Sequence, residues 1–307
     1  MNKPKVIVIC GPTASGKTAL SIELAKKIDG EIISCDSMQI YKDMNIGTAK
    51  VTESEMQGIK HYLVDFVSPD TRYSVADYKI DAEKAIENII SKGKIPIIVG
   101  GTGLYVDSLI YGIEYPEIKF DEEYRKKLEK EADEEGLENL YNKAKEIDEQ
   151  AMQKISVNDR KRIIRVLEIY HATGKNKTEQ EIESRKKEVK YDYKIFAINM
   201  DREKLYERIN IRVDKMIENG LIEEVENLRK KYNHFPTAMQ GLGYKEVVQY
   251  LQKELTKEEM IEKIKQESRR YAKRQLTWFR KNKQTIWIDG LANLEDNINI
   301  IEKELNK

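Results

Sequence analysis

Short apolar runs and longer amphipathic stretches alternate along the first third of the chain. The runs 6–10, 31–35 and 95–99 have the length and composition of buried strands, and polar residues or glycines follow each of them. The intervening stretches 19–28 and 75–92 carry apolar side chains at helical spacing. Strands that alternate with helices predict a parallel sheet with crossover connections. Because ligands bind such sheets at the carboxyl ends of the strands, we expect the polar ends of the three runs to form one site.

The strand pattern is lost between residues 120 and 190, where the apolar residues fall on helical faces. We therefore predict an α/β fold, with a P-loop NTPase-like parallel sheet core formed by 1–119 and 191–307 and a mainly helical insertion domain at 120–190. The other elements expected are a short strand at 61–66, a strand at 194–200, a long helix that ends near 220, two further helices to about 282 and a late strand at 285–288.

Composition narrows the class of protein only modestly. The chain has 307 residues with 54 Lys+Arg and 54 Asp+Glu, so the net charge argues neither for nor against a nucleic-acid partner. Two cysteines, Cys10 and Cys35, exclude a disulfide framework or a Cys-rich zinc site, and both are expected to be buried. In the absence of a targeting leader and of an apolar run long enough to span a bilayer, we expect a cytoplasmic protein without membrane contact. We also expect a monomer.

A phosphate-binding loop directly follows the first apolar run. The glycines permit a tight turn whose N–H groups point inward, and the helix that begins at the lysine adds positive potential. The lysine contributes a full charge, and the final hydroxyl is a ligand for a magnesium ion. This pattern predicts a site for a diphosphate or a triphosphate, formed by Gly11, Pro12, Thr13, Ala14, Ser15, Gly16, Lys17 and Thr18.

Two further polar segments follow strands. Asp36 comes directly after the second run, where a carboxylate can act as a base, hold a metal or cap a turn, and the sequence leaves these roles open. Ser37 and Gln39 beside it are able to hydrogen-bond a flat heterocycle. The third run ends in glycines and Thr102 instead of the acid that many nucleotide hydrolases use for magnesium, which counts against an ordinary ATPase.

Three parts of the chain carry cations of possible functional significance: one isolated arginine and two basic clusters. Arg212 lies among apolar residues of the long helix, either in a buried ion pair or as an anion clamp. Between residues 260 and 283, nine cations face only two glutamates, and Tyr271, Trp278 and Phe279 are interleaved with them. Cations together with aromatic side chains favour phosphate contacts and base stacking, so this segment indicates nucleic-acid binding. A second basic cluster lies in the insertion at 160–165.

Several motifs together resemble the bacterial tRNA dimethylallyltransferases, also called tRNA isopentenyltransferases. The resemblance covers nearly the whole chain in order, with small departures at Val51 and Tyr62. The motifs that carry it are the phosphate loop, Asp36-Ser37-Met38-Gln39-Ile40-Tyr41, Gly47-Thr48-Ala49-Lys50, Gly100-Gly101-Thr102-Gly103-Leu104-Tyr105, the segment 158–165, Gly241-Leu242-Gly243-Tyr244-Lys245-Glu246 and the segment 271–280.

The resemblance implies a reaction and a set of roles. Enzymes of this family transfer a dimethylallyl group from dimethylallyl diphosphate to N6 of the adenine at tRNA position 37, 3′ of the anticodon, and release diphosphate. By resemblance Asp36 is the general base, Thr102 and Arg212 hold the diphosphate and its bridging oxygen, and Lys17 acts with Mg²⁺ bound at Thr18. The target base is expected to flip out of its stack into a channel between the domains. The residues expected to contact the tRNA anticodon arm are Asp36, Ser37, Met38, Gln39, Thr102, Arg160, Lys161, Arg162, Ile163, Ile164, Arg269, Lys273, Arg274 and Lys281.

Three alternatives remain open on the residues alone. The phosphate loop also suits ATP, so a small-molecule kinase is possible, as is an isopentenyltransferase that acts on free adenine nucleotides. Neither needs two basic clusters. An RNA-binding protein with a structural nucleotide is the non-enzymatic alternative, but it leaves Asp36 and Thr102 without a role.

Overall fold

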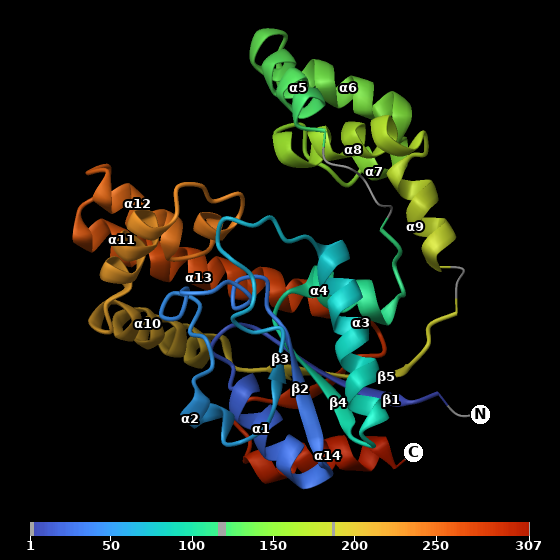
Figure 1. Ribbon diagram of the computed structural model, residues 1–307, viewed down its shortest axis with the longest axis vertical. Coiled ribbons are helices and arrows are strands. Elements are labelled where there is room, and N and C mark those ends of the chain that lie inside the picture. The colour runs from blue at the N-terminus through green and yellow to red at the C-terminus, as the bar shows by residue number, and fades with distance from the viewer. Residues whose placement is uncertain (1–2, 116–120, 186–187, 307) are drawn as a thin grey trace. The chain divides into compact units, whose positions relative to one another are not determined.

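The computed structural model describes residues 3–115, 121–185 and 188–306 (Figure 1). The chain forms two compact units, Met1–Leu109 with Lys190–Lys307, and Ile110–Val189. The second unit is the helical segment between the two halves of the first. The boundary predicted at residues 119 and 120 lies outside the described residues.

A parallel sheet of six strands forms the centre of the first unit. Its order is β3-β2-β4-β1-β5-β6, and every neighbouring pair is parallel. The α/β fold predicted from the alternating pattern is therefore confirmed. The strands are β1 (Lys5–Cys10), β2 (Gly30–Cys35), β3 (His61–Tyr62), β4 (Ile95–Gly100), β5 (Asp192–Asn199) and β6 (Ile286–Asp289). The edge strand β3 is shorter than the predicted run 61–66, because Leu63 and Asp65 adopt positive φ angles that end the extended conformation.

Helices cover both faces of this sheet. α1 (Lys17–Ile28) and α14 (Leu294–Leu305) share one apolar core with β1, β4 and β5, in which Ile9, Leu24 and Ile298 are buried. α3 (Val75–Ser91) packs against β2 and β4, and α2 (Glu53–Met56) and α4 (Gly103–Ile110) lie in the same half of the chain. Cys10 and Cys35 are buried free thiols, as expected. The terminal helix α14 was not predicted.

A second core lies beside the carboxyl ends of the strands. It joins the segment after β2 to four helices, and Tyr41, Met44, Val213 and Tyr244 are buried in it. The helices are α10 (Arg202–Glu218), α11 (Leu221–Lys231), α12 (Tyr244–Leu251) and α13 (Lys257–Phe279), with a short 3-10 turn η1 (Ala238–Gln240) before α12. The prediction of two helices after residue 220 was wrong, because Gly243 (φ 91°) interrupts the pattern and starts α12 separately.

The second unit is a bundle of short helices. Its core contains Leu128, Leu140, Ile163, Ile164 and Leu167. The helices are α5 (Glu122–Glu134), α6 (Leu137–Ile147), α7 (Glu149–Met152), α8 (Arg160–Thr173) and α9 (Lys177–Arg185). The side chain of Asp148, which is 3% exposed, accepts hydrogen bonds from Ala151 N and Thr178 N and so ties α9 to the bundle.

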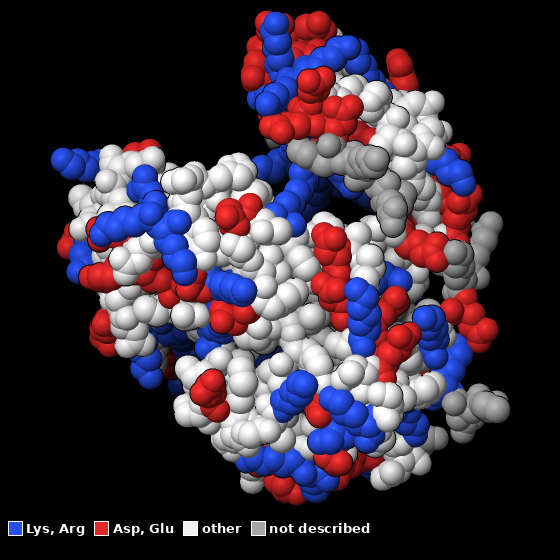
Figure 2. Space-filling model, viewed as in Figure 1, with Lys and Arg blue, Asp and Glu red and all other residues white. Residues whose placement is uncertain are grey.

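The surface carries mixed charge. On the face shown in Figure 2, Lys and Arg side chains are interspersed with Asp and Glu, in keeping with equal numbers of both. Within the described ranges, no helix combines the length and apolarity that crossing a bilayer requires.

Candidate active site

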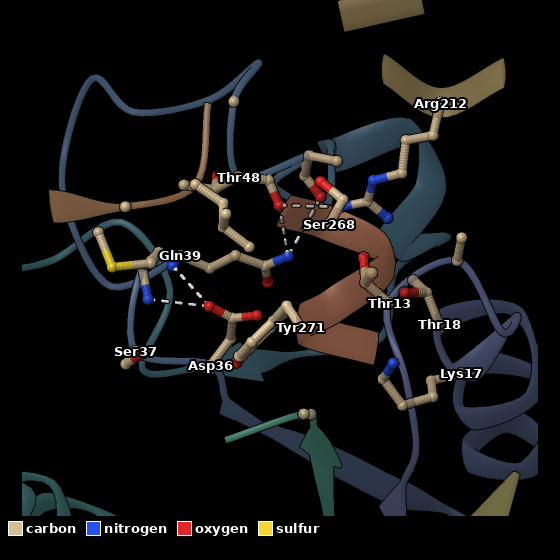
Figure 3. Close-up of a pocket in the computed structure, with 18 of the residues that line it drawn as sticks. Thr13, Lys17, Thr18, Asp36, Ser37, Gln39, Thr48, Arg212, Ser268 and Tyr271 are labelled. Carbon is tan, nitrogen blue, oxygen red and sulfur yellow. Dashed lines mark hydrogen bonds between the residues drawn. The ribbon is translucent and has the colours of Figure 1, made fainter. Parts of the chain in front are cut away.

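A pocket of about 540 Å³ lies at the carboxyl ends of the strands. The loops that follow β1, β2 and β4 form one side, and α10, α12 and α13 form the other. Every residue that lines it belongs to the first unit. Figure 3 shows Lys17, Thr18, Asp36, Arg212 and Tyr271 around this space. The sheet therefore brings together the strand ends that the sequence pattern had singled out.

The phosphate loop has the expected strand–turn–helix geometry. Gly16 has a φ of 91°, which favours glycine, and precedes α1 as its N-cap. Within the loop, Ser15 Oγ donates to the Pro12 carbonyl at 2.8 Å, and Lys17 Nζ donates to the same oxygen at 2.5 Å. The two hydrogen bonds fix the position of the lysine relative to the loop.

Lys17 and Arg212 are two of the cations that line the pocket. Burial and then the charge of Arg212 lower the pKa of Lys17 to about 8, while Asp36 acts in the opposite direction. Burial also lowers the pKa of Arg212, again against Asp36. Arg212 Nη2 donates to the Thr48 carbonyl at 3.2 Å. Among the described residues neither cation forms an ion pair, so of the two alternatives for Arg212 the structure favours the anion clamp. An anion that enters this pocket gains both charges.

Asp36 both caps a turn and presents a free oxygen. Its Oδ1 accepts from Met38 N at 2.8 Å and from Gln39 N at 3.3 Å. The other carboxylate oxygen has no hydrogen-bond partner among the described residues and faces the pocket in Figure 3. The cap therefore occupies one oxygen and leaves the second to take a proton.

Thr102 lies on the turn after β4, in contact with Ser37, the residue after Asp36, and is not among the residues that line the pocket. A Cβ on Gly100 would lie 2.0 Å from the Cys35 carbonyl, so only glycine lets the two strand ends approach so closely. The backbone N–H of Ser37 donates to Thr102 Oγ1 at 3.1 Å, and Thr102 Oγ1 donates to Ser37 Oγ at 3.4 Å. The hydroxyl of Thr102 is therefore anchored to the segment that carries Asp36.

Part of the segment expected to recognise a base forms hydrogen bonds within the protein. Gln39 Nε2 donates to the carbonyls of Thr48 at 3.3 Å and Ala49 at 3.1 Å. Both N–H groups of the Gln39 amide are therefore used within the protein. Only Oε1 is left to hydrogen-bond the flat heterocycle expected here from the sequence. Met38 lines the pocket and packs on the second core.

A glutamate that the sequence did not single out holds the loop after β2. Glu224 on α11 accepts from the backbone N–H groups of Asn45 at 2.8 Å, Ile46 at 2.7 Å and Gly47 at 3.1 Å. It also accepts from Tyr244 Oη at 2.6 Å. Since the next residues supply the carbonyls that bind Gln39 and Arg212, Glu224 shapes the pocket without lining it. No local pattern marks this residue.

α13 forms the opposite wall. Ser268, Tyr271, Arg274 and Gln275 line the pocket from successive turns of this helix. The hydroxyl of Tyr271 has its pKa raised to about 12, chiefly by burial and then by the charge of Asp36. The sequence marked Tyr271 only as an aromatic among cations. A sharper signal is polar Gln275, which occurs at a core position between Ala272 and Phe279.

The basic residues on α13 and just after its end fall into two groups, those without an ion-pair partner and those with one. Lys273, Arg274 and Lys281 are exposed and form no ion pair among the described residues. Arg269 is engaged, because its guanidinium donates to Asn210 Oδ1 at 2.7 Å and to Glu262 Oε1 at 2.8 Å. The first group is the one available for phosphate contacts.

The basic cluster of the second unit is also divided. Lys161 and Arg162 are exposed at the start of α8, whereas Arg160 forms an ion pair with Asp133 at 2.6 Å. Ile163 and Ile164 are 0% and 1% exposed within the helical core. Their predicted contact with RNA through the side chains was wrong, because the helical period of α8 turns both side chains inward.

The described residues include no group of three His, Cys, Asp or Glu side chains able to hold a metal. Magnesium, however, commonly takes few protein ligands and completes its shell with phosphate oxygens and water. The Thr18 hydroxyl at the start of α1 lines the pocket beside Lys17 and suits that role (Figure 3). The donor set thus fits a Mg²⁺ ion that arrives with a diphosphate.

Comparison with known proteins agrees with this geometry. A family model described as IPP transferase matches residues 39–282. The chain is 55% identical to the tRNA dimethylallyltransferase of Acetivibrio thermocellus over 285 residues. The match covers 92% of this chain and 91% of that protein. The chain belongs to the IPP transferase family. It is an enzyme, a prenyltransferase that acts on tRNA, as the sequence motifs had indicated.

Solved structures of similar proteins share the fold. The full-length tRNA isopentenylpyrophosphate transferase of Bacillus halodurans matches with a TM-score of 0.74 and 41% identity, over 99% of this chain and 96% of that chain. A eukaryotic dimethylallyltransferase acting on tRNA matches with a TM-score of 0.79 and 34% identity, over 94% of this chain and 74% of that chain. The P-loop-like core of the IPP transferases is therefore the core of this chain, and the kinase alternative is disfavoured.

Proposed function

We propose that the chain transfers the dimethylallyl group of dimethylallyl diphosphate to N6 of adenine 37 in the tRNA anticodon arm and releases diphosphate. The observation that carries this proposal is the composition of the pocket. Two cations without ion-pair partners, Lys17 and Arg212, face the same space as a carboxylate oxygen of Asp36 that is free to accept a proton. One charge pattern thus suits an anionic leaving group, and the other suits a nucleophile that must lose a proton.

The reaction divides between these groups. The bond between the dimethylallyl carbon and the diphosphate oxygen breaks, and the N6–carbon bond forms. Lys17, Arg212 and the N–H groups of the phosphate loop stabilise the charge that develops on the leaving diphosphate. The exocyclic amine of adenine is a weak nucleophile, so the proton that leaves N6 passes to the free oxygen of Asp36. Thr102 is hydrogen-bonded to Ser37, the residue after Asp36, so its hydroxyl is fixed relative to the segment that carries this carboxylate.

A Mg²⁺ ion held by the Thr18 hydroxyl and the diphosphate would neutralise part of the leaving-group charge. The protein groups described above bind and orient the two substrates.

Two surfaces suit the RNA backbone. Within the described part of the chain, the exposed cations without ion-pair partners include Lys273 and Arg274 on α13, Lys281 just after its end, and Lys161 on α8. Cations of this kind contact phosphates without reading sequence.

The test follows two substrates and two products. The protein is incubated with labelled dimethylallyl diphosphate and Mg²⁺, with either bulk tRNA or AMP as acceptor. Label should enter tRNA and not AMP, and diphosphate should appear in equal amount to modified adenine. A parallel incubation with ATP and tRNA should yield no ADP. Label in AMP would identify a free-nucleotide isopentenyltransferase, and stoichiometric ADP would identify a kinase.

A further inference from the structure

Gln275 connects the two loops that flank the reaction centre. Its side-chain amide is used at both ends: Oε1 accepts from the backbone N–H of Thr13 at 3.0 Å, and Nε2 donates to the carbonyl of Gly101 at 2.9 Å. The residue is 6% exposed. Thr13 belongs to the phosphate loop after β1, and Gly101 belongs to the turn after β4 that carries Thr102. One amide group therefore fixes the separation of the two loops.

The contact leaves no room for a different arrangement. A Cβ at Gly101 would lie 2.1 Å from Gln275 Nε2, so the helix and the turn touch directly. Three residues further along α13, Trp278 Nε1 donates to Asp107 Oδ2 at 3.0 Å, and its ring would lie 2.3 Å from a Cβ at Gly103. Two side chains of α13 thus fix the whole turn from Gly101 to Gly103.

The same face of the helix reaches the acid. Tyr271, one turn before Gln275, lines the pocket beside Asp36 in Figure 3. Lys273, which we propose contacts the tRNA backbone, lies on the same helix, and Lys281 follows directly after the helix C-cap Arg280. α13 therefore has the cations that suit tRNA on its exposed side and the link between the two catalytic loops on its buried side.

We propose that Gln275 is a positioning residue for prenyl transfer: by holding Thr13 and Gly101 on one amide, it aligns the diphosphate bound in the phosphate loop with Thr102 and Asp36. The inference rests on the proposed function. Both ends of the Gln275 amide are used in these two hydrogen bonds, so we assign its role to the loops that it holds. Its effect arises because a misplacement of about 1 Å between reacting groups can reduce the rate by about 100-fold.

The asymmetry of the amide gives a specific test. In Gln275→Glu, the protonated acid keeps one acceptor for Thr13 N–H and one O–H donor for the Gly101 carbonyl, so it replaces the amide group for group. The ionised form has no donor and faces the Gly101 carbonyl with a negative charge. Burial raises the pKa of such a carboxyl above its ordinary value, so the change should occur between about pH 5 and 8. Gln275→Leu has a similar volume and neither hydrogen bond at any pH.

The experiment measures kcat and KM for tRNA and for dimethylallyl diphosphate with the full chain, from pH 5.5 to 8.5, for wild type and both variants, together with their melting temperatures. We expect Gln275→Leu to lose about tenfold or more in kcat at every pH, with smaller changes in KM. The ratio of Gln275→Glu to wild type should approach one at low pH and fall as the pH rises. Dividing by wild type removes the pH dependence that the variant and the wild type share.

Each contrary result has a definite meaning. If Gln275→Leu keeps its kcat within twofold, the amide does not position the loops, and any loss in Gln275→Glu reflects charge alone. A ratio for Gln275→Glu that does not change with pH also overturns the proposal, including the case in which Gln275→Leu fails to fold. An inactive wild-type protein would overturn the proposed function instead, so the two failures are distinguishable.

Discussion

Arg212 acts together with burial on the pKa of Lys17. Burial removes water from the lysine amine, the arginine charge acts in the same direction, and together they lower the lysine pKa to about 8. Asp36 opposes both effects but is already engaged in a turn. A diphosphate bound in the pocket would offset the repulsion between these two positive charges. The affinity of the pocket for a diphosphate should therefore depend on pH.

The first prediction is that diphosphate binding takes up a proton. Above about pH 8 most Lys17 amines in the ligand-free protein are neutral, and the bound diphosphate raises the lysine pKa, so binding restores the charge. The affinity for dimethylallyl diphosphate should therefore be highest below pH 8 and fall as the pH rises through that value. Calorimetry at pH 8.5 in buffers of different ionisation enthalpy measures the proton directly. Lys17→Met should remove the uptake, and an equal proton count in both proteins would contradict the assignment.

A second prediction separates a base from a cap. Asp36→Asn keeps an acceptor for Met38 N and Gln39 N, so the turn should persist, but it removes the proton acceptor. Transfer to tRNA should fall by about 100-fold or more, with dimethylallyl diphosphate binding nearly unchanged. Asp201→Asn is the matched control, because Asp201 Oδ1 also accepts from residues two and three positions ahead, at the start of α10. Equal activity of the two variants would reduce Asp36 to a cap.

The third prediction concerns Glu224, which acts through the loop that it holds. In Glu224→Gln, one of the two carboxylate oxygens becomes an NH₂ group that faces backbone donors at Asn45 and Ile46, or at Gly47. Leaving such donors unpaired costs about 1–3 kcal/mol, so the melting temperature should fall. Since Thr48 anchors Arg212, the KM for dimethylallyl diphosphate should rise as well. Glu223→Gln, an exposed neighbour on α11, should change neither quantity; parallel losses in both variants would point to a general effect of charge.

Local pattern was sufficient for the parts of the site that lie close together in sequence. The apolar run before Gly11 and the helix after Gly16 identify the phosphate loop by spacing alone, and the ends of β2 and β4 mark Asp36 and Thr102. Gln275 escaped prediction because its partners lie 262 and 174 residues away, and Glu224 because the backbone N–H groups that it holds lie at least 177 residues away. No periodicity encodes such contacts.

The error at Ile163 and Ile164 has a different cause. Both residues belong to a basic motif, which favours contact with RNA. The helical period of the same segment instead favours burial of the two apolar side chains. That period places Ile163 one turn before Leu167 on the buried face of α8. Where a motif and an amphipathic pattern overlap, the apolar members of the motif are better assigned to the core.

The last prediction concerns the exposed cations of α13. Lys273 and Lys281 form no ion pair among the described residues and do not line the pocket, so replacing both by alanine should leave dimethylallyl diphosphate binding intact. If they contact the RNA backbone, each lost contact should lower the slope of log affinity against log salt by about 0.7 to 0.9. The loss should be the same for every tRNA, because phosphate contacts position the RNA and carry no sequence information. Binding of two different tRNAs across a salt series measures both effects.

The control for this prediction removes the same charge elsewhere. Arg229→Ala with Lys230→Ala takes two exposed cations from the last turn of α11, so a loss caused only by the net charge of the protein should appear in both double variants. If Lys273 and Lys281 contact the RNA backbone, the salt slope should decrease in the Lys273→Ala, Lys281→Ala double variant and stay unchanged in the control. An unchanged slope in that variant would show that the basic side of α13 is a solvated surface, even if transfer activity fell, because the slope counts phosphate contacts whereas activity also responds to the position of Gln275 on the same helix.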